Sequence, residues 1–399
     1  MRTTRIPALT AALAACVAIT SCGSDSGVAS TSTPAPVTSR ATGAAAPTSA
    51  TSPSAASSAP APSGAATCAA QQHYLDSLTL RQKLGQLLVV GVTGAADARS
   101  AVARGVGGVF IGSWTDQSVF SGGVLQSISS AAKVPPMVTI DEEGGRVSRL
   151  PGADLPSARR LAATMSPAQT RAEGKRVGAL LAKAGITVDF APDADVSDEA
   201  ADDVIGDRSF SNDPQKVAQY AAAFAAGLRD AGIYPVYKHF PGHGHGSGDS
   251  HKGSVTTPPL SAMKTDDLVP FRAVAGEDAG VMVGHLEVPG LTGGLPASLS
   301  PAAMSLLREG AGYGAKAHTG PIFTDDLSGM AAISGSYSIA QAVTKAITAG
   351  ADVALWITTD DLSGVLDTLT AAVRSGKLPR RAVDASVLRV AAVKHLARC

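Results

Sequence analysis

Polar and ionisable side chains follow five successive apolar runs of this 399-residue chain. They occupy residues 141–146, 193–195, 238–244, 285–287 and 325–326. Any one of these groups would serve as a turn or a helix cap, because Asp favours both. Five in succession indicate one shared site, because the carboxyl ends of parallel strands meet at one rim of a barrel. The carboxylates, histidines and cations gathered there are the side chains of acid–base and nucleophilic catalysis.

The elements that would position these side chains alternate between strand and helix. Short, mostly β-branched runs predict buried parallel strands, and they cover residues 87–92, 106–111, 137–140, 187–190, 234–237, 281–283, 321–323 and 353–357. Alanine-rich stretches such as 166–184, 213–231 and 338–349 predict helices between them. This pattern predicts an α/β fold, a (β/α)8 TIM-type barrel, with a doubly wound open sheet as the alternative. No glycine-rich dinucleotide or phosphate-binding motif follows the first strand, so no cofactor is expected.

The N-terminal part of the chain differs in composition from the rest. Residues 1–21 join two arginines to a short apolar run and small residues, which predicts a secretory signal peptide. The run leads into Ile-Thr-Ser-Cys22, which resembles a bacterial lipobox. We therefore expect lipid on Cys22 and anchoring to the outer face of the cytoplasmic membrane, with ordinary secretion as the alternative. Residues 22–67 are almost entirely Ser, Thr, Ala, Pro and Gly, which predicts a disordered tether.

The charge balance bears on possible binding partners, and the cysteines bear on disulfide formation. Lys+Arg and Asp+Glu both number 33, and the resulting zero net charge disfavours nucleic acid as a partner. Cys68 and Cys399 lie at the two ends of the expected domain, 68–399. In an exported protein such a pair favours a disulfide, the alternative being two free thiols. We expect a monomer whose membrane contact is the lipid anchor alone.

A histidine-rich stretch leaves functions other than acid–base and nucleophilic catalysis open. His239, His243, His245 and His251 lie close together, and with Asp249 they could bind zinc in a metallohydrolase. Their spacing, H-x3-H-x-H-x5-H, matches no strong zinc motif, so no metal is expected. A non-enzymatic sugar-binding lipoprotein is a further alternative, although it would need no nucleophile opposite an acid.

Taken together, the motifs resemble glycoside hydrolase family 3, and within it the bacterial β-N-acetylglucosaminidases that act on peptidoglycan fragments. The resemblance covers residues 70–399 in order. It rests on LTLRQKLGQLLVVG, IDEEGGRVSRL, VIGDRSF, KHFPGHG followed by DSH, and FTDDLSGM. It implies a single catalytic barrel domain of the short, one-domain type and a retaining mechanism.

The resemblance also implies the catalytic residues. Asp325 matches the family nucleophile, which would form a covalent bond to the sugar. The acid/base matches the pair Asp249 and His251, in which the carboxylate would orient and support the imidazole as in a Ser-His-Asp triad. The neighbouring Asp326 is expected to cap the following helix.

Further positions match the family's sugar-binding residues, which are Asp141, Arg149, Arg208, Lys238 and His239. The expected function is an exo-acting β-N-acetylglucosaminidase that releases GlcNAc from muropeptides or related glycans. A family 3 β-glucosidase and a GlcNAc phosphorylase are the alternatives. Two departures from the family pattern bear on the site: the pair Glu142-Glu143, and Gly329 inserted between Ser328 and Met330.

Overall fold

The computed structural model describes residues 67–399. The signal peptide predicted for 1–21, the lipid-bearing Cys22 and the tether as far as residue 66 lie outside the described residues. Within 67–399, no helix combines the length and the apolar character needed to cross a membrane.

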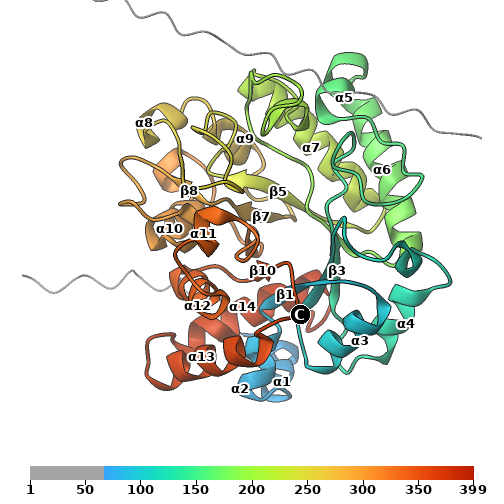
Figure 1. Cartoon of the computed structure of the whole chain (residues 1–399), viewed down its shortest axis with the longest axis vertical. Coiled ribbons are helices and arrows are strands. Elements are labelled where there is room, and N and C mark those ends of the chain that lie inside the picture. The colour runs from blue at the N-terminus through green and yellow to red at the C-terminus, as the bar shows by residue number, and fades with distance from the viewer. Residues whose placement is uncertain (1–66) are drawn as a thin grey trace, which may run out of the picture. The chain divides into compact units, whose positions relative to one another are not determined.

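Eight parallel strands form the barrel (Figure 1). In chain order they are β1 (Leu88–Val92), β2 (Gly108–Ile111), β3 (Met137–Ile140), β4 (Val188–Asp189), β5 (Tyr234–Phe240), β7 (Gly280–Val283), β9 (Ile322–Thr324) and β10 (Ala354–Trp356). They are hydrogen-bonded in the order β10-β1-β2-β3-β4-β5-β7-β9. A parallel bridge between Phe323 and Val353 joins the two edge strands. This ring confirms the predicted barrel and excludes the open sheet.

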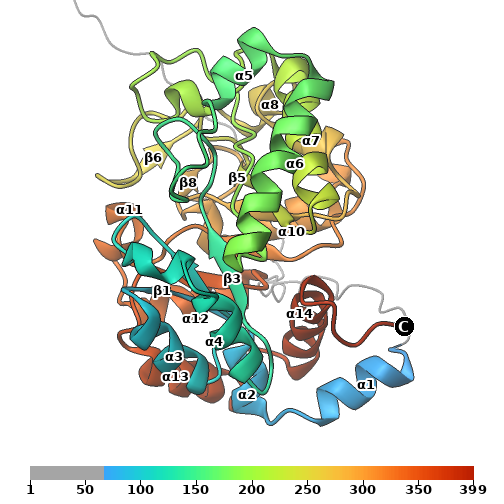
Figure 2. The same ribbon diagram turned by 90° about the vertical axis from the view of Figure 1, so that its right-hand side faces the viewer.

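Helices surround the strands (Figures 1 and 2). The longer ones are α3 (Ala95–Ala103), α4 (Val124–Ala131), α6 (Pro167–Ala184), α7 (Pro214–Asp230), α10 (Pro301–Glu309), α12 (Ile339–Ala349), α13 (Leu362–Arg374) and α14 (Arg380–Val393). The other α-helices are α1 (Ala69–Asp76), α2 (Leu80–Gly85), α5 (Ala158–Thr164), α8 (Leu260–Met263), α9 (Leu268–Ala273) and α11 (Ala331–Ser334). Single turns of 3₁₀ helix are η1 (Gln117–Phe120), η2 (Gly206–Arg208), η3 (Ala297–Leu299) and η4 (Ala311–Tyr313).

Local sequence signals set the ends of these helices, as α6 illustrates. Ser166 and Gln169 form a capping box, in which each side chain bonds the backbone of the other residue, and Pro167 occupies the first helical position. Gly185 ends the helix with a φ of 92°, a conformation that favours glycine, and the chain then enters β4.

Aromatic rings fill the barrel interior. Phe190 lies between Phe110 of β2 and Phe323 of β9, with ring centroids 5.7 Å and 5.5 Å apart, and all three are buried. Burial of each ring contributes about 1.5–3 kcal/mol to stability. Since Phe323 is two residues before Asp325, this packing fixes the strand end from which the predicted nucleophile emerges.

The two ends of the described chain meet. Cys68 and Cys399 form a disulfide, with their Cα atoms 6.0 Å apart and 331 positions between them in the sequence. In Figure 2 the C-terminus lies beside α1. The bond closes nearly the whole described chain into one covalent loop, which lowers the conformational entropy of the unfolded state.

Candidate active site

A cavity of about 320 Å³ opens among the segments that follow β3, β4, β5 and β9. Its lining residues are Arg146, Asp202, Asp203, Val204, Ile205, Arg208, His239, His243, Asp249, Ser250, His251, Lys252, Asp325 and Met330. Five of the side chains predicted from the sequence are therefore brought to one place, namely Asp325, Asp249, His251, Arg208 and His239.

Asp325 is the first residue after β9 and is buried against the cavity floor. Its Oδ1 accepts the backbone N–H of Asp326 at 2.8 Å. Burial alone would raise the pKa of Asp325, but interactions with His239 and His285, the N–H of Asp326 and the charge of Lys238 lower it below its usual value. The carboxylate is therefore ionised at neutral pH, as a nucleophile requires.

Asp326 holds the turn that follows the strand. Its carboxylate accepts the backbone N–H groups of Ser328 and Gly329, both at 2.8 Å. The next helix, α11, begins only at Ala331, so Asp326 caps a turn and not the helix expected from the sequence. A Cβ at position 329 would lie 2.5 Å from Asp326 Oδ2 and 2.6 Å from a side-chain carbon of Ile357, which explains the glycine.

His285, which follows β7, supports the same turn from below. One ring nitrogen, Nε2, lies 2.7 Å from the carbonyl oxygen of Asp326, and the other lies 2.7 Å from Ser298 Oγ. Burial lowers the pKa of His285, which favours the neutral ring. Its neutral form donates from one nitrogen and accepts at the other, so it fits between a carbonyl and a hydroxyl.

Asp249 and His251 meet in the dyad loop, which we define as residues 243–252. Asp249 Oδ1 lies 2.8 Å from His251 Nδ1 and also accepts the backbone N–H of His251 at 2.9 Å. The imidazole is 64% exposed, so it can reach a substrate in the cavity. Burial opposes ionisation of Asp249, but its hydrogen bonds with His251 and the His251 charge lower the pKa of that carboxyl.

The dyad loop is attached to two other segments. Just beyond it, β6 (Val255–Thr256) pairs in parallel with β8 (Leu286–Glu287). At its tip, the N–H groups of Ala331 and Ala332 donate to the carbonyls of His251 and Ser250, at 3.3 Å and 3.1 Å. Because Ala331 follows shortly after Asp325, the predicted acid/base and nucleophile segments contact one another directly.

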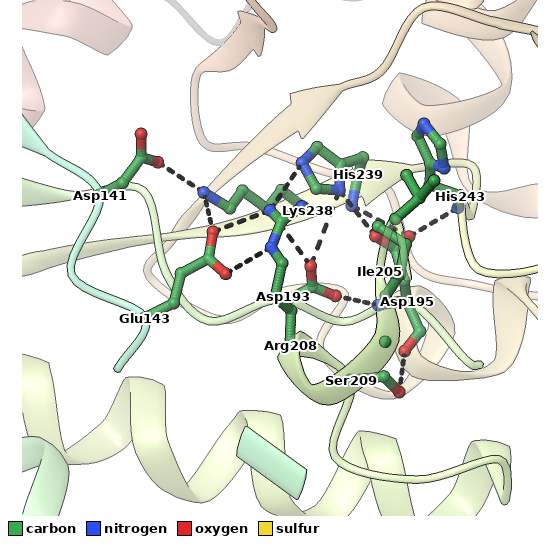
Figure 3. Close-up of polar contacts among 12 residues, drawn as sticks. Asp141, Glu143, Asp193, Asp195, Ile205, Arg208, Ser209, Lys238, His239 and His243 are labelled. Carbon is green, nitrogen blue, oxygen red and sulfur yellow. Dashed lines mark hydrogen bonds and ion pairs between the residues drawn. The ribbon is translucent and has the colours of Figure 1, made fainter. Parts of the chain in front are cut away.

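Glu143 joins two predicted sugar-binding cations at the base of the site (Figure 3). It accepts two hydrogen bonds from the Arg208 guanidinium, both at 2.8 Å, and its Oε1 lies 2.6 Å from Lys238 Nζ. Burial opposes ionisation, but the charges of Arg208 and Lys238 hold the pKa of Glu143 well below its usual value. Such a bidentate pair fixes the plane of the guanidinium.

His239 is oriented by a second buried carboxylate (Figure 3). Its Nδ1 lies 2.6 Å from Asp195 Oδ2, and the other oxygen of Asp195 accepts the N–H of His243 at 2.7 Å. Burial opposes ionisation of Asp195, but the charges of His239 and His243 lower its pKa to about 2. Burial and the charge of Asp195 raise the pKa of Asp193, which favours a neutral carboxyl beside Arg208.

The remaining predicted sugar-binding residues do not line the cavity. Lys238 is buried and its Nζ lies 2.5 Å from Asp141 Oδ1, so these two predicted residues act on each other. Among residues 67–399, the one hydrogen bond that the Arg149 side chain donates is long, at 3.4 Å, and goes to the Ser148 carbonyl. The backbone N–H of Arg149 donates to the carboxylate of Glu142, which is buried and so holds the turn formed by residues 142–150.

Three histidines of the 239–251 stretch, His239, His243 and His251, line the same cavity. Within the described residues, however, the four histidines of this stretch do not bring their ring nitrogens together as one set of metal ligands. Each lies near a different partner: Asp195 for His239, Ser250 for His243, Asp267 for His245 and Asp249 for His251. In residues 67–399, the one set of metal-ligating atoms close together belongs to Asp193, Asp195 and His239. There the imidazole is already bonded to Asp195.

Glu143, Asp193 and Asp195 were present among the strand-end motifs, but they received no role from the sequence. Their position after β3 and β4 was the available signal. Which carboxylate would meet a cation depended on contacts between segments far apart in the chain. Glu143 and Arg208, for example, are 65 positions apart.

Comparison with known proteins shows the family to which the chain is similar. Residues 79–393 match the family described as "Glycosyl hydrolase family 3 N terminal domain". The chain is 54% identical over 333 residues to beta-hexosaminidase LpqI of Mycobacterium tuberculosis, covering 82% of this chain and 86% of that protein.

Solved structures give the same picture. The structure of M. tuberculosis LpqI matches with a TM-score of 0.80 and 55% identity, covering 82% of this chain and 97% of that one. A glycoside hydrolase family 3 β-N-acetylglucosaminidase from Paenibacillus sp. FPU-7 matches with a TM-score of 0.74 and 32% identity, covering 80% of this chain and 62% of that one.

Proposed function

Since this chain belongs to glycosyl hydrolase family 3 and is a glycosidase of the β-hexosaminidase type, we propose that it is a retaining, exo-acting β-N-acetylglucosaminidase. Its substrate in this proposal is a muropeptide or related cell-wall glycan with a terminal β-linked GlcNAc. The observation that carries the proposal is that Asp325, Asp249 and His251 line one cavity. A retaining glycosidase needs a nucleophilic carboxylate and a separate acid/base at the same sugar.

In the first step, a carboxylate oxygen of Asp325 attacks the anomeric carbon. Protonated His251 donates its proton to the glycosidic oxygen while the bond between that oxygen and the anomeric carbon breaks. The aglycone departs as an alcohol, and GlcNAc stays bound as an ester of Asp325. Asp249 supports the charged imidazole before the transfer and fixes the ring's tautomer after it.

In the second step, water attacks the anomeric carbon on the face that the aglycone left. Neutral His251 takes a proton from that water, and the bond to Asp325 breaks. GlcNAc leaves with its original β configuration, and both catalytic groups return to their starting charges. Two inversions at one carbon give this net retention.

The walls of the cavity suit a single terminal sugar. A volume of about 320 Å³ is near the lower end for ligand sites, which favours one sugar unit over an internal stretch of chain. Arg208 and His239 line the cavity and offer N–H donors to sugar hydroxyls. Asp141, Arg149 and Lys238 do not line the cavity. In this proposal the bonded pair of Lys238 and Asp141 contributes to sugar binding through Glu143, which Lys238 shares with Arg208.

The proposal is tested with 4-nitrophenyl β-N-acetylglucosaminide. We expect the wild type to turn over and Asp325→Ala to lose about 10³-fold or more in kcat. His251→Ala should also lose activity. Asp367→Ala, at an exposed surface ion pair with Arg81, is the matched control and should keep wild-type rates.

Two results would contradict the proposal. Undiminished turnover by Asp325→Ala would reject the mechanism. Turnover of the β-glucoside in place of the β-N-acetylglucosaminide would reject the sugar. A further check is to run the reaction with added phosphate. Accumulation of a GlcNAc phosphate ester would show that phosphate, and not water, is the acceptor, and that the enzyme is a phosphorylase.

We also propose that the enzyme is exported and held at the outer face of the membrane through lipid on Cys22. The lipobox-like sequence before Cys22 supports this. Labelled palmitate should enter the wild-type protein, and Cys22→Ala should lose the label and leave the membrane fraction. Membrane retention of Cys22→Ala without label would contradict the lipid anchor.

A further inference from the structure

The dyad loop has a side-chain contact that the proposed chemistry leaves unused. His245 Nδ1 lies 3.0 Å from Asp267 Oδ1. Within residues 67–399, His245 is the only side chain of the dyad loop that bonds to a side chain outside that loop. His245 itself does not line the cavity, so it is placed to hold the loop and not to touch the substrate.

Asp267 belongs to a buried, packed part of the barrel. It is buried directly before α9, and Phe271 of that helix packs edge-on against Phe240, the last residue of β5, at 5.3 Å. A Cβ at Gly242 would lie 2.5 Å from the Cβ of Asp267, so the chain leaving β5 passes directly over this aspartate. His245 therefore ties the dyad loop to the point where the loop leaves its strand.

The charges around this pair favour its ionised form near neutral pH. The hydrogen bond with Asp267 raises the pKa of His245 to about 9, and the charges of Asp266 and Asp198 act in the same direction against partial burial. Burial raises the pKa of Asp267, with Asp266 and Asp195 adding to this and His245 opposing it. The attraction is thus present at neutral pH, is lost as pH rises through about 9, and is lost in acid as Asp267 protonates.

We infer that His245 and Asp267 are positioning residues that hold the dyad loop where His251 can reach the glycosidic oxygen. The inference rests on the proposed function. Proton transfer requires heavy atoms within hydrogen-bond reach, and a displacement of about 1 Å is enough to slow catalysis severely. The cavity residues Arg208 and His239 lie on other segments, so sugar binding should change less than proton donation.

The test compares two leaving groups through kcat/KM, which reports the first step. Methyl β-N-acetylglucosaminide needs a proton on its leaving oxygen, whereas the 2,4-dinitrophenyl glycoside leaves without one. His245→Gln and Asp267→Asn should lower kcat/KM about tenfold for the methyl glycoside and less than about twofold for the dinitrophenyl glycoside. Amide hydrogen exchange in residues 243–252 should become faster in both variants.

Control variants separate positioning from general damage. His245→Lys keeps a cation opposite Asp267 and should recover most of the methyl glycoside activity, while His73→Gln removes an exposed histidine on α1 and should change nothing. If Asp267→Asn fails to fold, the half-buried His245→Gln carries the test. An equal fall on both substrates, or no fall on either, would overturn the inference. Activity in Asp325→Ala would instead overturn the proposed function.

Discussion

Asp249 Oδ1 contacts His251 twice, at the ring Nδ1 at 2.8 Å and at the backbone N–H at 2.9 Å. One carboxylate oxygen therefore fixes both the chain and the ring of the residue two positions later. The ring is largely exposed, yet its direction is set by a neighbour in the same turn. An acid/base on a loop can be oriented in this way without being buried in the protein core.

The first prediction concerns that carboxylate. Asp249→Asn retains an oxygen that can accept the backbone N–H, but it removes the charge that supports the imidazolium. We expect kcat/KM for methyl β-N-acetylglucosaminide to fall about 10²-fold or more, with a smaller loss for the dinitrophenyl glycoside.

Asp116→Asn is the matched control, because Asp116 likewise accepts a backbone N–H two residues on, from Ser118, outside the cavity. It should keep wild-type kinetics. Equal kinetics in Asp249→Asn and wild type would show that the carboxylate does not support the acid/base.

The second prediction concerns Glu143. Glu143→Gln leaves Arg208 and Lys238 as two buried cations without their shared anion. We expect the free energy of unfolding to drop by about 3–5 kcal/mol and KM to rise, because Arg208 loses its fixed orientation in the cavity. Urea unfolding at neutral pH and steady-state kinetics measure the two effects.

Glu173→Gln makes the same chemical change in the exposed pair with Arg176, where the cost should stay below about 1 kcal/mol. Equal unfolding free energies for Glu143→Gln and Glu173→Gln would show that the buried ion pairs of Glu143 do not stabilise the fold more than an exposed pair does.

The third prediction concerns the turn after Asp325, the proposed nucleophile. In Gly329→Ala the added carbon lies 2.5 Å from the Asp326 carboxylate, which bonds the backbone of this turn, so the carboxylate or the turn has to shift. Overpacking of this kind costs about 1–3 kcal/mol, and the shift should also lower kcat because Asp325 is adjacent.

Gly94→Ala serves as the comparison, since its new carbon would approach nothing nearer than 3.5 Å. The measurements are the thermal unfolding and the kcat of Gly329→Ala and Gly94→Ala, each compared with the wild type. An unchanged Gly329→Ala enzyme would mean that the turn accommodates a side chain.

The fourth prediction concerns acid stability. Burial and the charge of Arg308 lower the pKa of His318 to about 4, so His318 is neutral in the folded state at pH values where the unfolded chain binds a proton. Its contribution is complete above about pH 6.5 and is lost as pH falls toward 4. We expect this group to account for roughly 2 kcal/mol of the stability lost between pH 7 and 4.5.

His318→Gln should therefore show a shallower decline of unfolding free energy with acid than the wild type does. His73→Gln, which removes an exposed histidine, should leave the slope unchanged. Parallel curves for wild type and His318→Gln would exclude His318 as the titrating group.

Much of the fold was predictable because its signals are local. Most strands are short runs rich in β-branched residues, and helices such as α6 carry their own caps in the sequence. The polar residues at strand ends also predicted the rim at which Asp325 and His239 now meet, because strand direction alone decides that rim.

The pairing of side chains at the rim depends on how the segments after the strands pack together. Segments that follow neighbouring strands bring Glu143 to Arg208 and Asp195 to His239. Folding of the long connection between β5 and β7 brings His245 to Asp267. Which side chains reach the rim can be predicted from the amino-acid sequence, because that depends on local periodicity and chain direction. Which charges meet there follows from three-dimensional packing, because the partners are 22 to 65 positions apart in the chain and no local pattern encodes their distance.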